Sequence, residues 1–212
     1  MTEAKIVSAI KNYVTSQRGV TGFPLRNEQV ADEVDTLRMR MIAEMDANRM
    51  FRKPYQGFVQ KIEFTVPVSK KLVLPKVYVK ADGTHAVEYI GGKNGTTQYR
   101  LVSGINHGNW IDKDEYSIFP IAVIEGQEIT FKNFGSNDLM MLAVFEDPSD
   151  LEEYGYDPGY DSDDGASEYP MPNSMIDMII GKTAESYLRT MYRVPPQPNK
   201  QVDIPGADAV QP

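Results

Sequence analysis

At residues 58–66 the sequence reads Phe-Val-Gln-Lys-Ile-Glu-Phe-Thr-Val, and the spacing of its apolar residues changes here from helical to alternating. The alternating apolar residues are Ile62, Phe64 and Val66. Successive side chains of a strand point to opposite faces, so this period predicts a strand with one buried face. The stretch therefore marks the start of a β-region after a helical beginning.

Strand and turn signals continue from this point to residue 146. The runs 76–80 and 86–90 flank Asp82-Gly83, a dipeptide that favours tight hairpin turns. We expect further strands at 98–103, 117–124, 128–134 and 139–146, with Glu125-Gly126-Gln127 as the turn between the middle pair. Together these signals predict an antiparallel β-domain of about six to eight short strands over residues 58–146.

The clearest helical pattern precedes the β-region. Asn27 is the predicted N-cap of this helix, and Glu28 in its first turn suits the helix dipole. The apolar stripe comprises Val30, Val34, Leu37, Met41 and Met45, with Ile42 beside it. The opposite, polar side comprises Asp32, Glu33, Asp35, Arg38, Arg40 and Glu44. We interpret the methionine-rich stripe as a packing face, and contact with another subunit is the alternative because methionine adapts to irregular surfaces.

Two more helices are predicted near the ends of the chain. Residues 3–17 place Ile6, Ile10 and Val14 four residues apart, which is helical spacing. The third helix follows Tyr169-Pro-Met-Pro172, ends at Pro195-Pro196, and has the apolar stripe Ile176, Ile179, Ile180, Thr183, Tyr187 and Met191. Neither end alone buries enough apolar surface, so we expect residues 1–57 and 169–194 to pack together as one helical part. The predicted fold class is α+β, with the antiparallel β-domain of residues 58–146 inserted between the helices.

Charge distinguishes two further segments. Residues 147–168 contain acidic and turn-forming residues and no basic residue, which predicts an exposed acidic loop that is partly disordered without a partner. Residues 195–212 are predicted to be an extended C-terminal tail.

The chain has a net charge of −8 and no cysteine, which excludes disulfides and thiolate metal sites. Clustered basic residues and long apolar runs are both missing, so we expect neither specific nucleic-acid binding nor a membrane span.

Residues able to carry out catalysis or bind metal are few. The histidines, His85 and His107, lack metal-ligand spacing, and we expect neither to be catalytic. Gly181-Lys182-Thr183 resembles the end of a phosphate-binding loop, but Ile176 stands where that motif needs glycine. Counted from Asp161, the acidic stretch 157–165 also fails the calcium-loop pattern. We therefore predict a protein that is not an enzyme, with no catalytic residues, cofactor or metal.

Three stretches resemble the neck proteins of tailed bacteriophages, the head-to-tail connector or ring proteins of short-tailed and crAss-like phages. The first combines residues 6–12 with residues 27–38, which are similar to the opening helices of that family. The second is Phe145-Glu-Asp-Pro148 at the end of the β-region. The third runs from Tyr169-Pro-Met-Pro172 through Ile179-Ile180 to Pro195-Pro196 and Asn199. The order of elements also resembles tail-tubular adaptors, which place a β-rich part between helices.

The resemblance implies a structural role in the virion, to which the protein would be added in the host cytoplasm. Its implied partners are copies of itself in a ring of twelve, the portal protein, and an adjacent neck or tail protein. Genomic DNA would pass through the ring without sequence-specific binding. We further expect apolar faces of the terminal helices to meet other copies or the adjoining assembly.

Two alternatives remain open at this point. One is another virion structural protein, such as a head decoration or tail-attachment protein. The other is a small carbohydrate-binding or hydrolase β-domain, for which Trp110 and the acidic residues of 161–164 are the only support.

Overall fold

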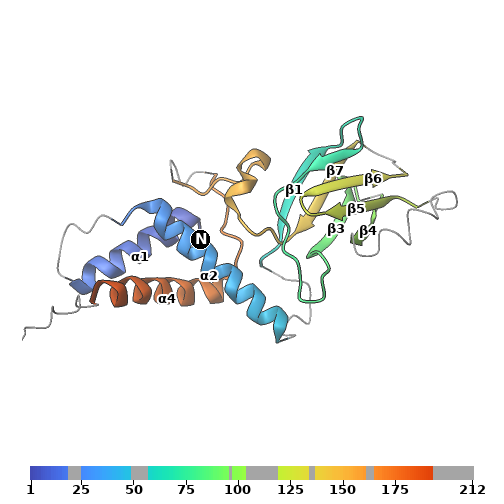
Figure 1. Ribbon diagram of the computed structural model, residues 1–212. Coiled ribbons are helices and arrows are strands. Elements are labelled where there is room, and N and C mark those ends of the chain that lie inside the picture. Colours follow the sequence, from blue (N-terminus) through green and yellow to red (C-terminus); the bar gives the residue numbers. More distant parts are fainter. Residues whose placement is uncertain are drawn as a thin grey trace, which may run out of the picture.

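Helices from the two ends of the chain form one unit, and the strands between them form a second unit beside it (Figure 1). The computed structural model describes residues 1–18, 25–48, 57–95, 97–103, 119–133, 137–160 and 165–192. The helical unit consists of α1 (Glu3–Arg18), α2 (Asn27–Ala47) and α4 (Asn173–Tyr192). This arrangement confirms the predicted α+β class and the predicted packing of the two chain ends.

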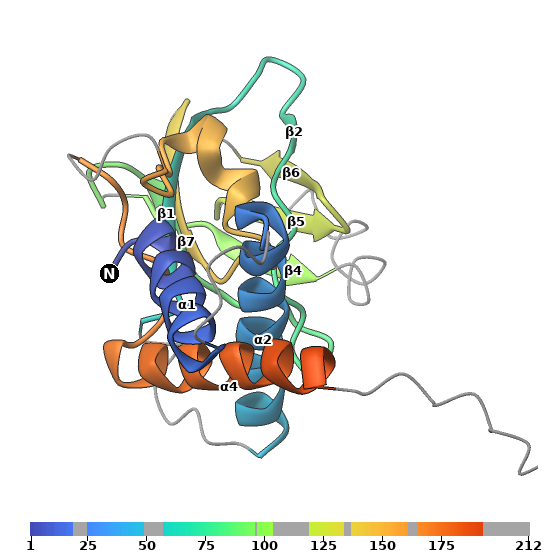
Figure 2. The ribbon, with the colours of Figure 1, turned by 90° about the vertical axis from the view of Figure 1, so that its left-hand side faces the viewer.

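The helical unit has its own apolar core. Figure 2 shows α4 lying across α1 and α2. The most deeply buried helical side chains are Ile6, Ile10, Val14, Val30, Val34, Ile42, Ile176 and Ile179. Burial of one such side chain contributes roughly 1.5–3 kcal/mol, so these contacts hold the two chain ends together.

The expectation that these helical faces meet other copies of the chain is wrong. Each apolar face is already covered by the other two helices of the same chain. Exposed apolar side chains of the helical unit are instead scattered, as at Tyr13 and Met178. These faces are therefore not available for contacts with other proteins.

The start of α2 also differs from the prediction. Arg26 occupies the N-cap position, with extended backbone and no side-chain cap, and Asn27 is the first helical residue. The Asn27 side chain instead accepts a hydrogen bond of 2.8 Å from the Lys11 ammonium group of α1. Asn27 thus links two helices rather than capping one.

The second unit is a β-sandwich of seven strands in the described part of the chain, within the predicted range. The strands are β1 (Gln60–Thr65), β2 (Lys71–Val73), β3 (Val87–Gly92), β4 (Arg100–Ser103), β5 (Ile121–Glu125), β6 (Glu128–Lys132) and β7 (Asp138–Ala143). One sheet has the order β1-β7-β3 and the other β2-β6-β5-β4. Apolar side chains of both sheets share one core, in which Phe131 contacts the rings of Phe64 and Tyr99.

One strand pair corrects the expectation of a wholly antiparallel domain, because β4 and β5 run parallel. A parallel pair needs a long connection, and residues 104–120 provide one between these strands. The predicted turn at residues 125–127 is confirmed, with Gly126 in the left-handed conformation between β5 and β6.

The expected strand at 76–80 forms isolated bridges instead of a continuous ladder. Val77 bridges to Phe145, and Val79 bridges to His85 across the predicted Asp82-Gly83 turn. The segment therefore contacts two different partners, each over a short length.

Residues 147–168 were expected to form an exposed loop, and this expectation is wrong for much of the segment. A 3₁₀ helix, η3 (Ser149–Tyr154), places Leu151 in the core of the β-sandwich. Residue 158 then accepts a backbone hydrogen bond from Ala4 at the start of α1. The segment links the two units because its apolar and aromatic residues pack inward while its carboxylates stay outside.

Candidate functional site

A buried arginine lies where the helical unit meets the β-sandwich. Arg38 of α2 has an exposed fraction of 0%. Its Nε donates a hydrogen bond of 3.0 Å to the carbonyl oxygen of Pro170, and its Nη1 donates one of 3.1 Å to that of Phe145. A longer contact of 3.4 Å reaches the carbonyl oxygen of Glu146. Arg38 thereby joins three parts of the chain: α2, the end of the β-region and the approach to α4.

A carboxylic acid and a tyrosine accompany this arginine. The Tyr169 hydroxyl donates a hydrogen bond of 2.5 Å to the carboxyl group of Asp35, one turn before Arg38. Burial raises the pKa of Asp35 to about 7, although the Tyr169 hydrogen bond and the nearby Arg38 charge oppose this rise. Asp35 therefore changes between its protonated and its ionised form near neutral pH.

A second acid, Glu3, anchors the start of the chain. Glu3 is 4% exposed and accepts hydrogen bonds from Tyr156 at 3.2 Å and from Tyr160 at 3.0 Å. Burial raises the pKa of Glu3 above its ordinary value. The backbone N–H of Tyr169 donates to the carbonyl oxygen of Met1 nearby. We call the six residues that make these contacts the junction cluster: Glu3, Asp35, Arg38, Tyr156, Tyr160 and Tyr169.

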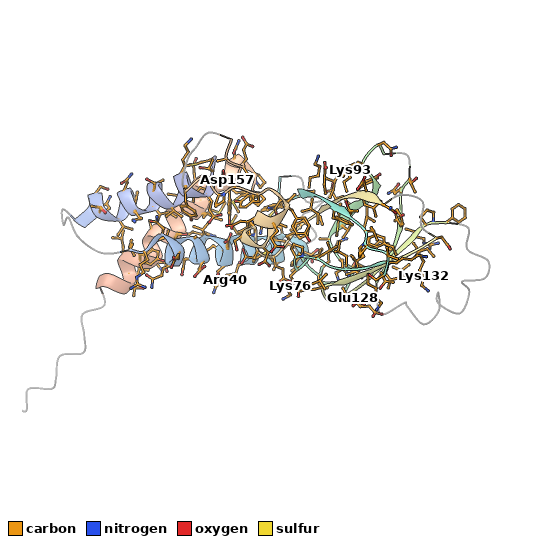
Figure 3. All side chains as sticks on the ribbon, turned by 90° about the horizontal axis from the view of Figure 1, so that it is seen from above. Arg40, Lys76, Lys93, Glu128, Lys132 and Asp157 are labelled. Carbon is orange, nitrogen blue, oxygen red and sulfur yellow. The ribbon has the colours of Figure 1, made fainter. Side chains whose placement is uncertain are left out.

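A further contact ties the other end of α2 to the β-sandwich. The Asp46 carboxylate accepts hydrogen bonds from the backbone N–H of Ala81, at 2.6 Å, and from the hydroxyl of Tyr78, at 3.3 Å. Burial and the Asp46 charge raise the pKa of Tyr78 to about 12. A groove of about 660 Å³ runs along α2, and residues 78–79 and 146–147 form its other side. Arg40 lines this groove, and Figure 3 shows Arg40 and Asp157 on opposite edges of the elongated molecule.

The junction cluster is arranged to hold two folded units in one orientation. Its acids already accept hydrogen bonds from tyrosines, and its arginine donates to backbone carbonyls of two segments. Charge-assisted hydrogen bonds of this kind are directional and stronger than neutral ones. The arrangement fixes geometry, and it makes that geometry sensitive to protonation of Asp35.

The structure separates the residues that the sequence singled out. His85 is half-buried in the bridge to Val79, and burial lowers its pKa. The triplet at 181–183 lies inside α4. A phosphate-binding loop directly precedes the start of a helix, so the triplet does not have the geometry of that motif. Asp157 accepts a hydrogen bond of 2.8 Å from the N–H of Gly159 and so forms part of a local turn. These residues do not converge.

The other candidates lie outside the described residues. These are His107, Trp110 and residues 161–164. Within the described ranges, three or more histidine or acidic side chains nowhere gather in a metal-binding arrangement. Among the described helices, none combines the length and the hydropathy of a membrane span.

Sequence reasoning missed the junction cluster, although two signals were present. Arg38 lies four residues after Val34 and four before Ile42, so helical spacing places it on the buried face. The acidic segment also contains tyrosines at positions 154, 156 and 160, which a purely solvated loop does not require. Both signals were missed because the charge of Arg38 and of the acidic segment predicted exposed positions instead.

Comparison with models of known protein families gives no match, and no curated protein matches the chain.

Proposed function

We propose that this chain is a non-enzymatic structural subunit of a bacteriophage virion neck. In this role, copies of the chain form a ring at the portal, join the head to the tail and continue the DNA channel. The proposal combines the resemblance of three sequence stretches with the geometry of the folded chain.

The observation that carries the proposal is the elongated shape with two different ends (Figure 1). The helical unit forms one end and the β-sandwich the other, and the junction cluster connects them through buried hydrogen bonds. A subunit that joins two different assemblies needs two distinct surfaces at a fixed separation. This fold supplies such surfaces without using the core of either unit.

Exposed apolar residues of the β-sandwich offer contact points for neighbouring proteins. Val68, in the turn before β2, is 101% exposed, and Phe119, before β5, is 68% exposed. Val73 lies on β2, an edge strand of its sheet, and is also exposed. These positions replace the helical faces as the surfaces on which assembly would depend.

The charge of the subunit agrees with a DNA conduit. The net charge is −8, and like charge discourages a duplex from binding to the wall of a channel. We therefore expect DNA to pass through the ring without sequence-specific contacts.

The test is to mix the purified chain with a portal protein encoded in the same genome and to examine the product by negative-stain microscopy and mass measurement. We expect a ring of identical subunits, twelve in number, on one face of the portal. A chain that stays monomeric and ignores the portal contradicts the proposal. Binding to the capsid surface away from the portal would identify a head decoration protein instead.

A further inference from the structure

A pocket of about 510 Å³ lies at the junction, and Tyr156 and Tyr169 of the junction cluster form part of its lining. Its walls come from the beginning of β1, from η3 and from the segment that leads into α4. The lining includes the ring-bearing residues Tyr154, Tyr156, Pro170 and Pro172. The size is within the range of pockets that enclose small ligands or short peptide segments.

Gln60 gives this pocket an unusual polar group. Its Nε2 and Oε1 atoms are both buried, and neither has a hydrogen-bond partner within the described structure. Buried amides are normally hydrogen-bonded, because loss of water without replacement costs folding free energy. The neighbours of Gln60, Val59 and Lys61, also line the pocket, so it follows the strand backbone.

Beside this pocket, the outer edge of β1 has no strand paired to it within the described residues. There β1 is the end strand of its sheet and pairs with β7. Val66, which continues the same register, donates its backbone N–H to Asn137. In an antiparallel pair, successive residues of a strand direct their backbone N–H and C=O groups alternately toward the partner strand and away from it. The backbone groups of Gln60 and Ile62 therefore point toward β7, as those of Val66 do. The backbone groups of Lys61 and Glu63 point away from β7.

An extended peptide matches both features. A strand added to an open edge supplies alternating N–H and C=O groups. A peptide group also offers one donor and one acceptor, which is what the Gln60 amide requires. The tyrosine and proline rings of the walls suit the apolar side chains of such a strand.

The chain itself contains a segment of this kind beyond α4. Residues 200–204 read Lys-Gln-Val-Asp-Ile, in which Val202 and Ile204 alternate with polar residues, and Pro205 follows. This period is that of a strand with one apolar face.

Geometry favours a neighbouring copy as the source of the segment. α4 begins at the pocket, which Asn173 lines, and its 20 residues carry the chain to the far end of the helical unit (Figure 1). That length is about 30 Å. Residues 193–199 separate this end from the segment, and seven residues at full extension span at most about 25 Å. The segment of the same chain would therefore reach its own pocket only by running straight back along α4, whereas the pocket of a neighbouring copy carries no such constraint.

We propose that residues 200–204 of one copy add as a strand to the open edge of β1 in a second copy, with Gln60 hydrogen-bonded to the inserted backbone. The proposal rests on the self-association included in the proposed function. It specifies how adjacent subunits would be linked.

The test uses a fluorescent peptide of residues 193–212 and the full-length chain as receptor. The receptor carries Val202→Lys and Ile204→Lys, so that its own segment does not compete. We expect saturable binding by fluorescence anisotropy, and at least tenfold weaker binding of a control peptide with both apolar residues changed to aspartate. Equal binding of the two peptides would overturn the proposal.

Receptor variants locate the binding site. Gln60→Ala should weaken binding about fivefold, as expected for the loss of one neutral hydrogen-bonding group. Lys61→Pro should abolish binding, because it removes an outward N–H and places a ring on the edge while the pairing with β7 is kept. Lys71→Ala, on β2 in the other sheet, is the matched control and should bind as the parent does. If Lys61→Pro fails to fold, Gln60→Ala still decides the result.

Hydrogen exchange distinguishes the possible arrangements. We expect the peptide to slow exchange in residues 60–65, and unchanged exchange there would contradict the proposal. In the unmodified chain, protection of this edge should rise with protein concentration. Protection that is independent of concentration would show that the segment binds to β1 of its own chain. That result would overturn the proposal that it binds to a second copy. Peptide binding without portal binding, or the reverse, separates this inference from the proposed function.

Discussion

Replacement of Arg38 by methionine is expected to lower the free energy of unfolding by about 2–5 kcal/mol, since each buried carbonyl left without a donor costs about 1–3 kcal/mol. Methionine fills similar space but donates no hydrogen bonds. The carbonyl oxygens of Pro170 and Phe145 would then lose their donor while remaining buried. Chemical denaturation followed by circular dichroism measures the loss.

Arg40→Met is the matched control, because Arg40 is an exposed arginine on the same helix. We expect its free energy of unfolding to stay within about 0.5 kcal/mol of the parent chain, as for ordinary surface substitutions. If Arg38→Met and Arg40→Met prove equally stable, the junction cluster does not hold the two units together.

The second large effect concerns pH. In the folded chain Asp35 keeps its proton until a pKa of about 7, whereas its ordinary pKa is 3.8. Between these values the folded state binds more protons than the unfolded state, so stability falls as pH rises. We expect the contribution of Asp35 to fall by about 2–4 kcal/mol from pH 4 to pH 8, since one pKa unit corresponds to about 1.4 kcal/mol.

Two variants isolate this contribution from those of other acids. Asp35→Asn should remove it, so that the variant matches the parent near pH 4 and is more stable at pH 8. Tyr169→Phe removes the hydrogen bond that favours ionised Asp35, so the fall in stability should extend to higher pH. Denaturation curves from pH 4 to pH 9 provide the measurement. Parallel pH profiles for the parent and Asp35→Asn would refute the assignment.

The sequence predicted those helices and strands in which apolar residues recur at a regular spacing. Ile6, Ile10 and Val14 have helical spacing, and the alternation at residues 60–66 is that of a strand, so both were identified without tertiary information. The packing of the two chain ends was also predictable, because short amphipathic helices need partners. The direction of the strands was not predictable, because the spacing of apolar residues is the same in parallel and antiparallel pairs such as β4 with β5 and β5 with β6.

The junction cluster shows why the site was harder to predict than the fold. Arginine is almost always exposed unless it is paired, so its charge placed Arg38 on the polar side of the helix. The partners that make burial possible, at positions 145 and 170, lie more than 100 residues away. A backbone carbonyl leaves no sequence signature, and only the folded chain brings these groups together.

The discontinuity of the helical unit affects how the protein is made. Translation produces α1 and α2 first, but the helix that completes their core is encoded after the entire β-sandwich. At about 5–20 residues per second, a ribosome needs on the order of ten seconds to synthesise residues 48–172. During that interval the nascent N-terminal helices have exposed apolar faces, which are natural targets for chaperones. The final assembly of this unit must therefore follow synthesis of residues 173–192.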